Sequence, residues 1–303
     1  MKRSDFIHTS LLGALSASEI IDRKSVESRP PAPRPFNLFY APHDGMFAVS
    51  AGKDFHDQIR FLHDQGFKAI EDNGMLRRPP AEQQLIGDLL EKLEMKMGVF
   101  VVDGGDNWKI SLTTGRPEFT DLFLKTCRES VEAAKRCRAT WLTVVPGFID
   151  RNIPVGIQTA YVIDAMKRGV EIFEPHKLVM VIETLSDTPE LFLQHTDHTY
   201  SICKAVNSPA CKILYDIYHM QRNEGNVITT IDRCYDEIGY FQIGDVPGRK
   251  EPGTGEINYK NIFKYLHSKN YTGVLGMEHG NSGNGKAGEM SLIKTYRDVD
   301  SFV

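Results

Sequence analysis

Short apolar runs alternate with longer amphipathic stretches from about residue 36 to the end of the chain. The apolar runs are of strand length and cover residues 36–42, 67–72, 95–103, 140–147, 178–185, 213–219, 240–245 and 274–280. Apolar runs that end in turn or polar residues are typical of strands buried on both faces of a parallel sheet. The pattern therefore predicts eight parallel strands.

The stretches between these runs have apolar residues three and four positions apart, as at Leu124, Cys127 and Val131, which predicts helices. They cover residues 53–65, 80–94, 118–136, 156–173, 188–206, 227–237, 258–268 and 287–301. Eight strand–helix units of about thirty residues predict the α/β class and a closed (β/α)8 TIM barrel. A doubly wound open sheet is the alternative, but no G-x-G-x-x-G follows the first strand.

The N-terminal extension differs in kind from the barrel. Lys2, Arg3 and the small apolar run at residues 11–17 resemble a bacterial twin-arginine export signal, although Ser4 replaces the second arginine. A disordered leader is the alternative. Residues 29–35 are proline-rich and read as a linker. We expect a leader and linker at 1–35 and one barrel domain at 36–303, in the cytoplasm, or in the periplasm if the signal functions.

Composition removes several classes of function. The chain has 303 residues, 41% of them hydrophobic, and a net charge of −4, which argues against general binding of nucleic acid or anionic membranes. Its apolar runs are shorter than the roughly 20 residues of a membrane span. We therefore expect neither a nucleic-acid partner nor a membrane span, and leave a homo-oligomer open.

Polar residues close four consecutive strand-like runs in the second half of the chain. They are Glu183, Asp216, Gln242 and Glu278. The carboxyl ends of barrel strands meet at one mouth, so these side chains are expected to converge. Their oxygens suit a hard cation, Mg²⁺ or Mn²⁺, which would also offset the repulsion between three carboxylates. Separate hydrated carboxylates are the alternative.

Four further side chains are candidates for contacts with a substrate. His219 follows Asp216 on the sixth predicted strand, and Arg249 follows the seventh strand with a fork suited to a carboxylate or to vicinal oxygens. Glu71 ends the second strand and His43 follows the first. The glycine-rich segment 250–256 is either a mobile lid or a plain surface loop.

Longer segments carry a family resemblance. DIYHMQ at 216–221, QIGDVPGR at 242–249, EPGTGEINY at 251–259 and GMEH at 276–279 resemble the hydroxypyruvate isomerase family, within the wider group of xylose-isomerase-like TIM barrels. The resemblance implies metal ligands at Glu183, Asp216, Gln242 and Glu278, with Glu183 and Glu278 as the catalytic pair. Related ketose epimerases place substrate contacts at His219 and Arg249. The segment TLSDT after Glu183 and the histidine at 279 depart from the family pattern.

The reaction that this resemblance implies is an aldose–ketose isomerisation through an enediolate, with hydroxypyruvate converted to tartronate semialdehyde as the first expectation. A ketose 3-epimerase or another sugar isomerase would use the same residues. A non-catalytic sugar-binding protein and a hydrolase of the endonuclease IV type are further alternatives. The expected cofactor is Mg²⁺ or Mn²⁺, and the expected partner is a small hydroxy-carbonyl compound or sugar.

Overall fold

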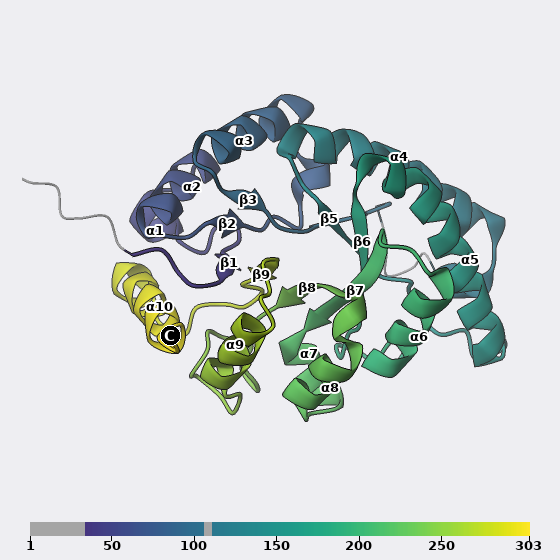
Figure 1. Cartoon of the computed structure of the whole chain (residues 1–303). Helices are drawn as coiled ribbons and strands as arrows, with labels where there is room; N and C mark the ends of the chain where they lie inside the picture. Colours follow the sequence, from purple (N-terminus) through teal and green to yellow (C-terminus); the bar gives the residue numbers. More distant parts are fainter. Residues whose placement is uncertain (1–33, 106–110) are drawn as a thin grey trace, which may run out of the picture. The chain divides into compact units, whose positions relative to one another are not determined.

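A computed structural model of the chain describes residues 34–105 and 111–303. Of the leader and linker expected at 1–35, residues 1–33, which include the signal-like residues, lie outside the described residues. Residues Ala32–Val303 form one compact unit. Its helices surround a ring of strands, as Figure 1 shows for the labelled elements. The predicted TIM barrel is confirmed.

The strands run parallel in chain order around this ring. Their bounds are β1 Phe39–Ala41, β2 Ala69–Ile70, β3 Lys96–Met97, β4 Phe100–Val101, β5 Trp141–Val144, β6 Val179–Glu183, β7 Cys211–Asp216, β8 Ile238–Gln242 and β9 Val274–Gly276. Pairing follows β1-β9-β8-β7-β6-β5-β4, and β2 pairs with β3. A parallel bridge between His43 and Glu71 joins the ends of β1 and β2.

The third predicted strand, 95–103, is divided into β3 and β4. β3 pairs with β2, whereas β4 pairs with β5. Between them the Gly98 N–H donates to the carbonyl oxygen of Ile70 at 2.7 Å. The segment that contains β3 and β4 therefore pairs with β2 on one side and with β5 on the other. Counted as one strand, it keeps the eight-stranded arrangement expected from the sequence.

Helices cover the outside of the strands and complete the units. The α-helices are α1 Ala48–Ala51, α2 Phe55–Asp64, α3 Pro80–Lys92, α4 Pro117–Cys137, α5 Val155–Phe173, α6 Thr196–Val206, α7 Ile217–Asn223, α8 Val227–Cys234, α9 Tyr259–Ser268 and α10 Gly285–Val299. Short 3-10 turns are η1 Met75–Arg77, η2 Leu112–Thr114, η3 Glu174–His176 and η4 Tyr235–Glu237. No helix within 34–105 and 111–303 is long and apolar enough to cross a membrane.

Most predicted elements are shifted or shortened by a few residues, and two further ones differ in a way that matters for the site. The strand expected at 213–219 ends at Asp216, and a helix, α7, follows it directly, so the prediction that His219 lies on a strand was wrong. Asp216 caps α7, because its Oδ1 accepts the Tyr218 N–H at 2.8 Å. The helix expected from residue 188 begins only at Thr196.

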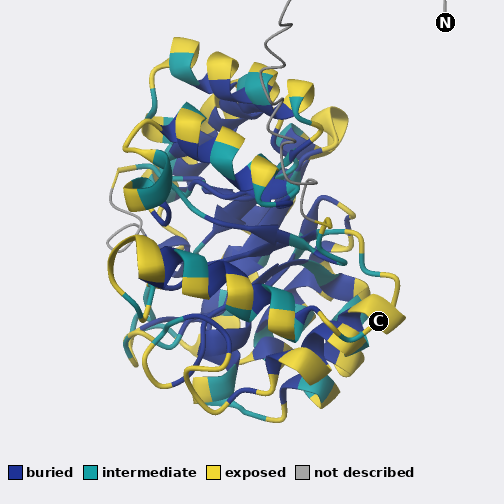
Figure 2. Ribbon diagram, turned by 90° about the vertical axis from the view of Figure 1, so that its left-hand side faces the viewer, coloured by how far each residue is buried: buried dark blue, intermediate teal, exposed yellow. Residues whose placement is uncertain are grey.

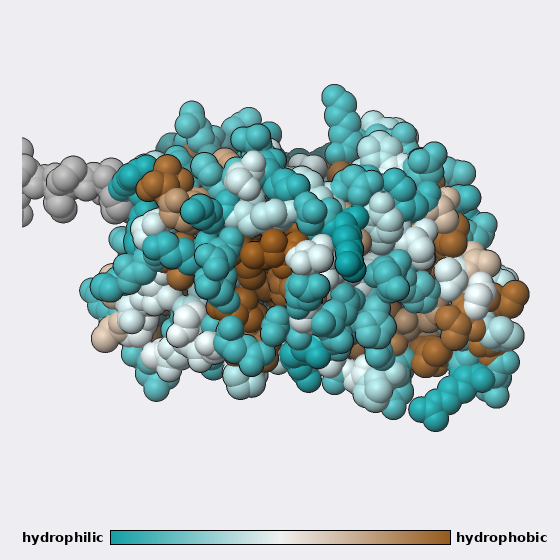
Figure 3. All heavy atoms as spheres, turned by 60° about the horizontal axis from the view of Figure 1, so that its bottom comes forward, coloured by the Kyte–Doolittle hydropathy of each residue, from teal (hydrophilic) through white to brown (hydrophobic). Residues whose placement is uncertain are grey.

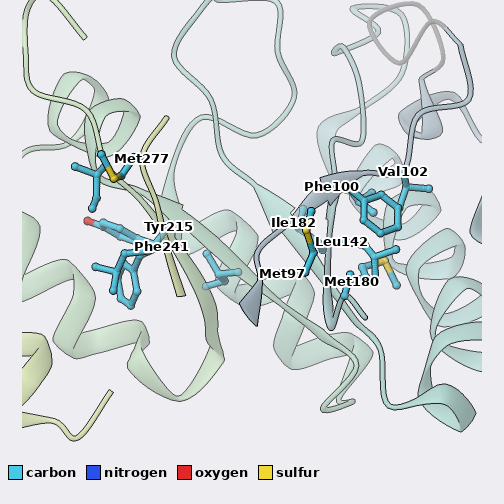
Figure 4. Close-up of a cluster of buried hydrophobic side chains, with 14 of the residues drawn as sticks. Met97, Phe100, Val102, Leu142, Met180, Ile182, Tyr215, Phe241 and Met277 are labelled. Atoms are coloured by element: carbon cyan, nitrogen blue, oxygen red, sulfur yellow. The ribbon is translucent and has the colours of Figure 1, made fainter. Parts of the chain in front are cut away.

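Alternation along the strands divides the core into two layers. Residues such as Val181, Leu214 and Tyr240 fill the barrel interior. Their neighbours Ile182 and Tyr215 belong to the larger layer between strands and helices (Figure 4). Figure 2 shows the buried sheet and the exposed outer faces of the helices. On the face shown in Figure 3 the surface is mostly hydrophilic, with hydrophobic residues in separate groups.

Gly87 provides a test of helix packing. It is buried on α3, and a Cβ there would overlap the carbonyl group of Arg136 on α4. Gly87→Ala is therefore expected to lower the free energy of unfolding by about 1–3 kcal/mol, even though alanine is the better helix former. Gly156→Ala in α5 is the matched control, because its Cβ would meet nothing within 4 Å. Chemical denaturation measures both variants, and equal stabilities would contradict this account.

Candidate active site

The strand period explains why polar side chains reach the barrel mouth. On β6, β7 and β8 the interior residues Val181, Leu214 and Tyr240 are each followed two positions later by a polar residue. Side chains two positions apart on a strand share a face. The polar residues that continue the interior face are Glu183, Asp216 and Gln242, at the carboxyl ends of their strands.

Glu183, Asp216 and His219 form a compact cluster. One potential ligand atom from each lies within 4.8 Å of the other two, and all three residues are buried. Glu183 comes from β6, Asp216 from β7 and His219 from the first turns of α7. The structure thus brings together residues that are separated by a whole βα unit in sequence.

The hydrogen bonds of His219 define its tautomer. The Ser186 N–H donates to Nδ1 at 3.1 Å, so Nδ1 is an acceptor and the proton of the neutral ring lies on Nε2. Burial lowers the pKa of His219, which favours this neutral form. Nε2 lies 3.4 Å from Asp216 Oδ2 and has no hydrogen-bond partner among the described residues. It can therefore donate to an oxygen in the cavity.

Arg249 lies between Asp216 and Glu278. Its Nη2 donates to Asp216 Oδ2 at 3.1 Å and to Glu278 Oε2 at 2.9 Å. The guanidinium carbon is 4.9 Å from the centre of the Tyr218 ring. The backbone at Arg249 is left-handed, with φ 48°, a conformation that surrounding contacts must hold. Arg249 therefore pairs with two carboxylates of the site.

Asp245 anchors the glycine-rich segment that follows Arg249. It is fully buried, and its carboxylate accepts N–H groups from Gly253 and Gly255 at 2.9 Å and from Ile257 at 3.0 Å. These bonds hold the loop in one conformation, which favours a fixed loop over the mobile lid.

Glu71 and Gln242 are paired beneath the mouth. The Gln242 Nε2 donates to Glu71 Oε1 at 2.9 Å, and each residue is only 1% exposed. Gln242 Oε1 is buried and has no hydrogen-bond partner within the described part of the chain. A buried amide oxygen in this state is a vacant acceptor for a hydrogen or a cation.

Burial and mutual repulsion perturb the carboxyl groups of the site. Burial, followed by the charges of Glu278 and Asp216, raises the pKa of Glu183 well above its usual value. Burial, with Asp216 as the next cause, raises the pKa of Glu278 to about 8. Perturbed carboxyls in a cavity are typical of groups that exchange protons or bind cations.

A cavity of about 350 Å³ opens over these groups. Its lining includes the candidates Glu183, Glu278, His219 and Arg249. Sequence reasoning missed the rest of its polar wall, which is made of Asn73, Arg77, Asp103, Thr143 and Asp187. Asn73, Arg77 and Asp187 follow predicted strands, a place that many surface residues share. Thr143 and Asp103 lie within predicted strands, at positions that the sequence reasoning did not single out.

Four candidates lie outside this lining, namely Asp216, Gln242, Glu71 and His43. Glu71 is below the cavity, as described above. His43 borders a separate hollow with His279 and Glu289, and its Nε2 is 3.3 Å from the His279 carbonyl oxygen. The structure therefore does not bring His43 to the cavity that is lined by Glu183, Glu278, His219 and Arg249.

The chemistry of the cluster fits a divalent cation. Three carboxylates, Glu183, Asp216 and Glu278, face the single guanidinium of Arg249. When all three are ionised, two negative charges remain, which matches one divalent ion. The vacant Gln242 Oε1 adds a neutral oxygen ligand. His219 has its proton on the nitrogen that faces the cluster, which suits donation better than ligation.

The strand order and the surrounding helices define a (β/α)8 barrel, and its acidic site lies at the carboxyl ends of the strands. The chain belongs to the xylose isomerase-like TIM barrel family, whose model matches residues 59–297. The wider family resemblance expected from the sequence is confirmed.

Curated relatives are similar over part of their length. The chain is 36% identical over 122 residues to the hydroxypyruvate isomerase of Escherichia coli K12, which covers 40% of this chain and 47% of that protein. It is 33% identical over 161 residues to a 2-oxo-tetronate isomerase of Cupriavidus necator, which covers 53% of this chain and 54% of that protein. The matches thus span about half the length of these two relatives.

Solved structures share the fold at low identity. A 3-keto-D-glucoside 4-epimerase from E. coli gives a TM-score of 0.72 at 14% identity, covering 86% of this chain and 98% of that one. A protein titled AP endonuclease, family 2, from Brucella melitensis gives 0.71 at 22% identity, covering 84% and 96%. These likenesses show the fold alone.

Proposed function

We propose that the protein is a metal-dependent isomerase that interconverts a small hydroxy-aldehyde and a hydroxy-ketone through an enediolate. The observation that carries this proposal is a pair of glutamates, the buried Glu183 and the partly exposed Glu278, which line one cavity. The same cavity is lined by a hydrogen-bond donor, His219, and a guanidinium, Arg249. The names of the curated relatives, hydroxypyruvate isomerase and 2-oxo-tetronate isomerase, support the reaction class.

In the proposed reaction one glutamate of the pair takes the proton from the hydroxyl-bearing carbon, and the carbonyl oxygen gains the electron pair. A proton then returns at the former carbonyl carbon from the same or the other glutamate. The proton of the substrate's hydroxyl group passes to the former carbonyl oxygen, the hydroxyl-bearing carbon becomes the new carbonyl, and the net change is an isomerisation. His219 Nε2–H and the Arg249 guanidinium donate to substrate oxygens, which become more negative in the enediolate.

A Mg²⁺ or Mn²⁺ ion bound at this site would supply electrostatic stabilisation of the charge that develops on these oxygens. Glu183, Asp216, Gln242 and Glu278 would hold it, since their oxygens form the donor set described above.

The first expected substrate is hydroxypyruvate, with tartronate semialdehyde as product. The cavity of about 350 Å³ offers more room than a three-carbon acid needs, and Asn73 Oδ1 and Thr143 Oγ1 in its wall are buried without hydrogen-bond partners in the described chain. This room favours a longer 2-oxo acid or a ketose as the second candidate, the latter with 3-epimerisation. Hydrolysis of nucleic acid is disfavoured by the net charge of −4.

A panel of substrates tests the proposal. The full chain, assayed with added Mn²⁺, is expected to convert at least one compound among hydroxypyruvate, four-carbon 2-oxo acids and ketohexoses. In D₂O, exchange through an enediolate places deuterium on the carbon that receives the proton. Turnover of a ketohexose with deuterium at carbon 3 would identify an epimerase. Absence of turnover on the whole panel would contradict the enzyme assignment.

A further inference from the structure

We propose that Glu71 is a positioning residue, which holds the Gln242 side-chain amide so that its oxygen, and not its nitrogen, faces the cation site. This inference rests on the proposed metal-dependent function. The sequence alone suggested a substrate contact for Glu71, but the residue lies below the cavity and outside its lining. Its effect on the site must therefore pass through a neighbour.

Both oxygens of the Glu71 carboxylate are already engaged. Oε1 accepts from Gln242 Nε2 at 2.9 Å, and Oε2 accepts from the Tyr240 hydroxyl at 2.7 Å. Both donors come from β8, two positions apart on the interior face. One carboxylate from β2 thus receives two donors from a strand on the other side of the barrel interior.

The direction of these bonds decides which end of the amide meets the cation. An ionised carboxylate only accepts, so Glu71 in that form selects the NH₂ end of Gln242. The Oε1 end is left facing away from Glu71, buried and without a hydrogen-bond partner in the described residues. If the amide were reversed, an N–H group would face the cation and one ligand would be lost.

Neighbouring glycines provide the space for this arrangement. A Cβ at Gly276, on β9, would overlap the Glu71 carboxylate. A Cβ at Gly98 would overlap the Tyr240 hydroxyl. The absence of a side chain at these two glycines therefore leaves room for the hydrogen bonds of Glu71 with Tyr240 and Gln242. Packing and hydrogen bonding agree that this network has one arrangement.

The test measures Mn²⁺ affinity by isothermal titration calorimetry of the full chain after chelation, which does not depend on activity. Glu71→Gln keeps the shape of the side chain. The Tyr240 hydroxyl is expected to donate to the amide oxygen of the new glutamine, so the NH₂ group of that glutamine faces Gln242. Gln242 must then rotate its own amide so that its oxygen accepts from this NH₂ group. Glu71→Met removes the acceptor altogether. Each variant is expected to bind Mn²⁺ about 10-fold or more weakly, in the range known for partners of metal ligands.

A double-mutant cycle separates positioning from charge or packing. On a Gln242→Ala background, Glu71→Gln and Glu71→Met are expected to cause no further loss of Mn²⁺ affinity, because the group they act through is absent. Tyr215→Phe, a buried hydroxyl removed from the adjacent β7, is the control and should bind as the parent does. Thermal melts check that each variant is folded, and Glu71→Gln serves if Glu71→Met is not.

The outcomes distinguish this inference from the proposed function. Parent-like Mn²⁺ affinity in Glu71→Gln, or an equal loss with and without Gln242, would overturn the positioning role and leave the metal site intact. Failure of the parent protein to bind Mn²⁺ would overturn both. The inference is supported if Glu71→Gln lowers the Mn²⁺ affinity of the parent protein but causes no further loss on the Gln242→Ala background.

Discussion

Glu183→Gln is expected to lower turnover by about a thousandfold or more, within the range of effects for removing an acid–base group. The amide has the shape of the carboxylate but cannot take up a proton, and it is a weaker ligand for a cation. Glu278→Gln is expected to have a similar effect for the same reason. The measurement is the initial rate with saturating Mn²⁺ on the best substrate of the panel, together with deuterium uptake from D₂O.

The matched control for this experiment is Glu190→Gln. Glu190 is exposed on the segment that follows β6, so the same change of charge occurs outside the cavity. Its turnover should equal that of the parent protein. A Glu183→Gln variant that keeps parent turnover, while remaining folded, would contradict the proposed chemistry and favour a non-catalytic binding protein.

Removal of metal is expected to make stability depend strongly on pH. Burial is the first cause that raises the pKa of Glu71 to about 7 and of Glu278 to about 8, from a usual value of 4.5. The folded state then holds protons that the unfolded chain has released. The stability that these groups contribute is complete below pH 4.5 and is lost as the pH rises through about 7 to 8.

A bound cation replaces the protons, so its stabilising effect should grow with pH. The melting temperature of the chelated protein is expected to fall between about pH 6 and about pH 8, and added Mn²⁺ should raise it more at the higher pH. Scanning calorimetry measures both. Glu278→Gln removes one of the titrating groups and should flatten the decline. Melting curves unaffected by Mn²⁺ at either pH would argue against the cation site.

The fold was largely predictable because its signals are local. Apolar runs and amphipathic stretches recur in every unit, and each needs only a few neighbouring residues to be recognised. The error at β7 has a local cause too. The apolar residues of α7 continue those of the strand, while Asp216 is both the last strand residue and the helix cap. Capping, rather than hydropathy, marks that boundary.

The candidate site was predictable only in part. Glu183, Asp216 and Gln242 occupy interior positions of strands, so period and strand end together point to them. Thr143 lies on β5 two positions after Trp141, which packs against the barrel interior, so the strand period could have found it. Asn73 has no such signal, because it lies in the loop after β2, where loop conformation decides which side chains face the cavity. The same uncertainty affected His43.

The order of residues alone determined the barrel class and the end of the barrel where polar groups gather. These follow from periodicities of two and 3.6 residues, which depend on the backbone rather than on distant contacts. Only the tertiary structure decided that Glu71 pairs with Gln242, that Arg249 lies between Asp216 and Glu278, and that His219 donates from Nε2. Hydrogen bonds between residues far apart in sequence depend on where barrel closure places each strand, and no local pattern records that position.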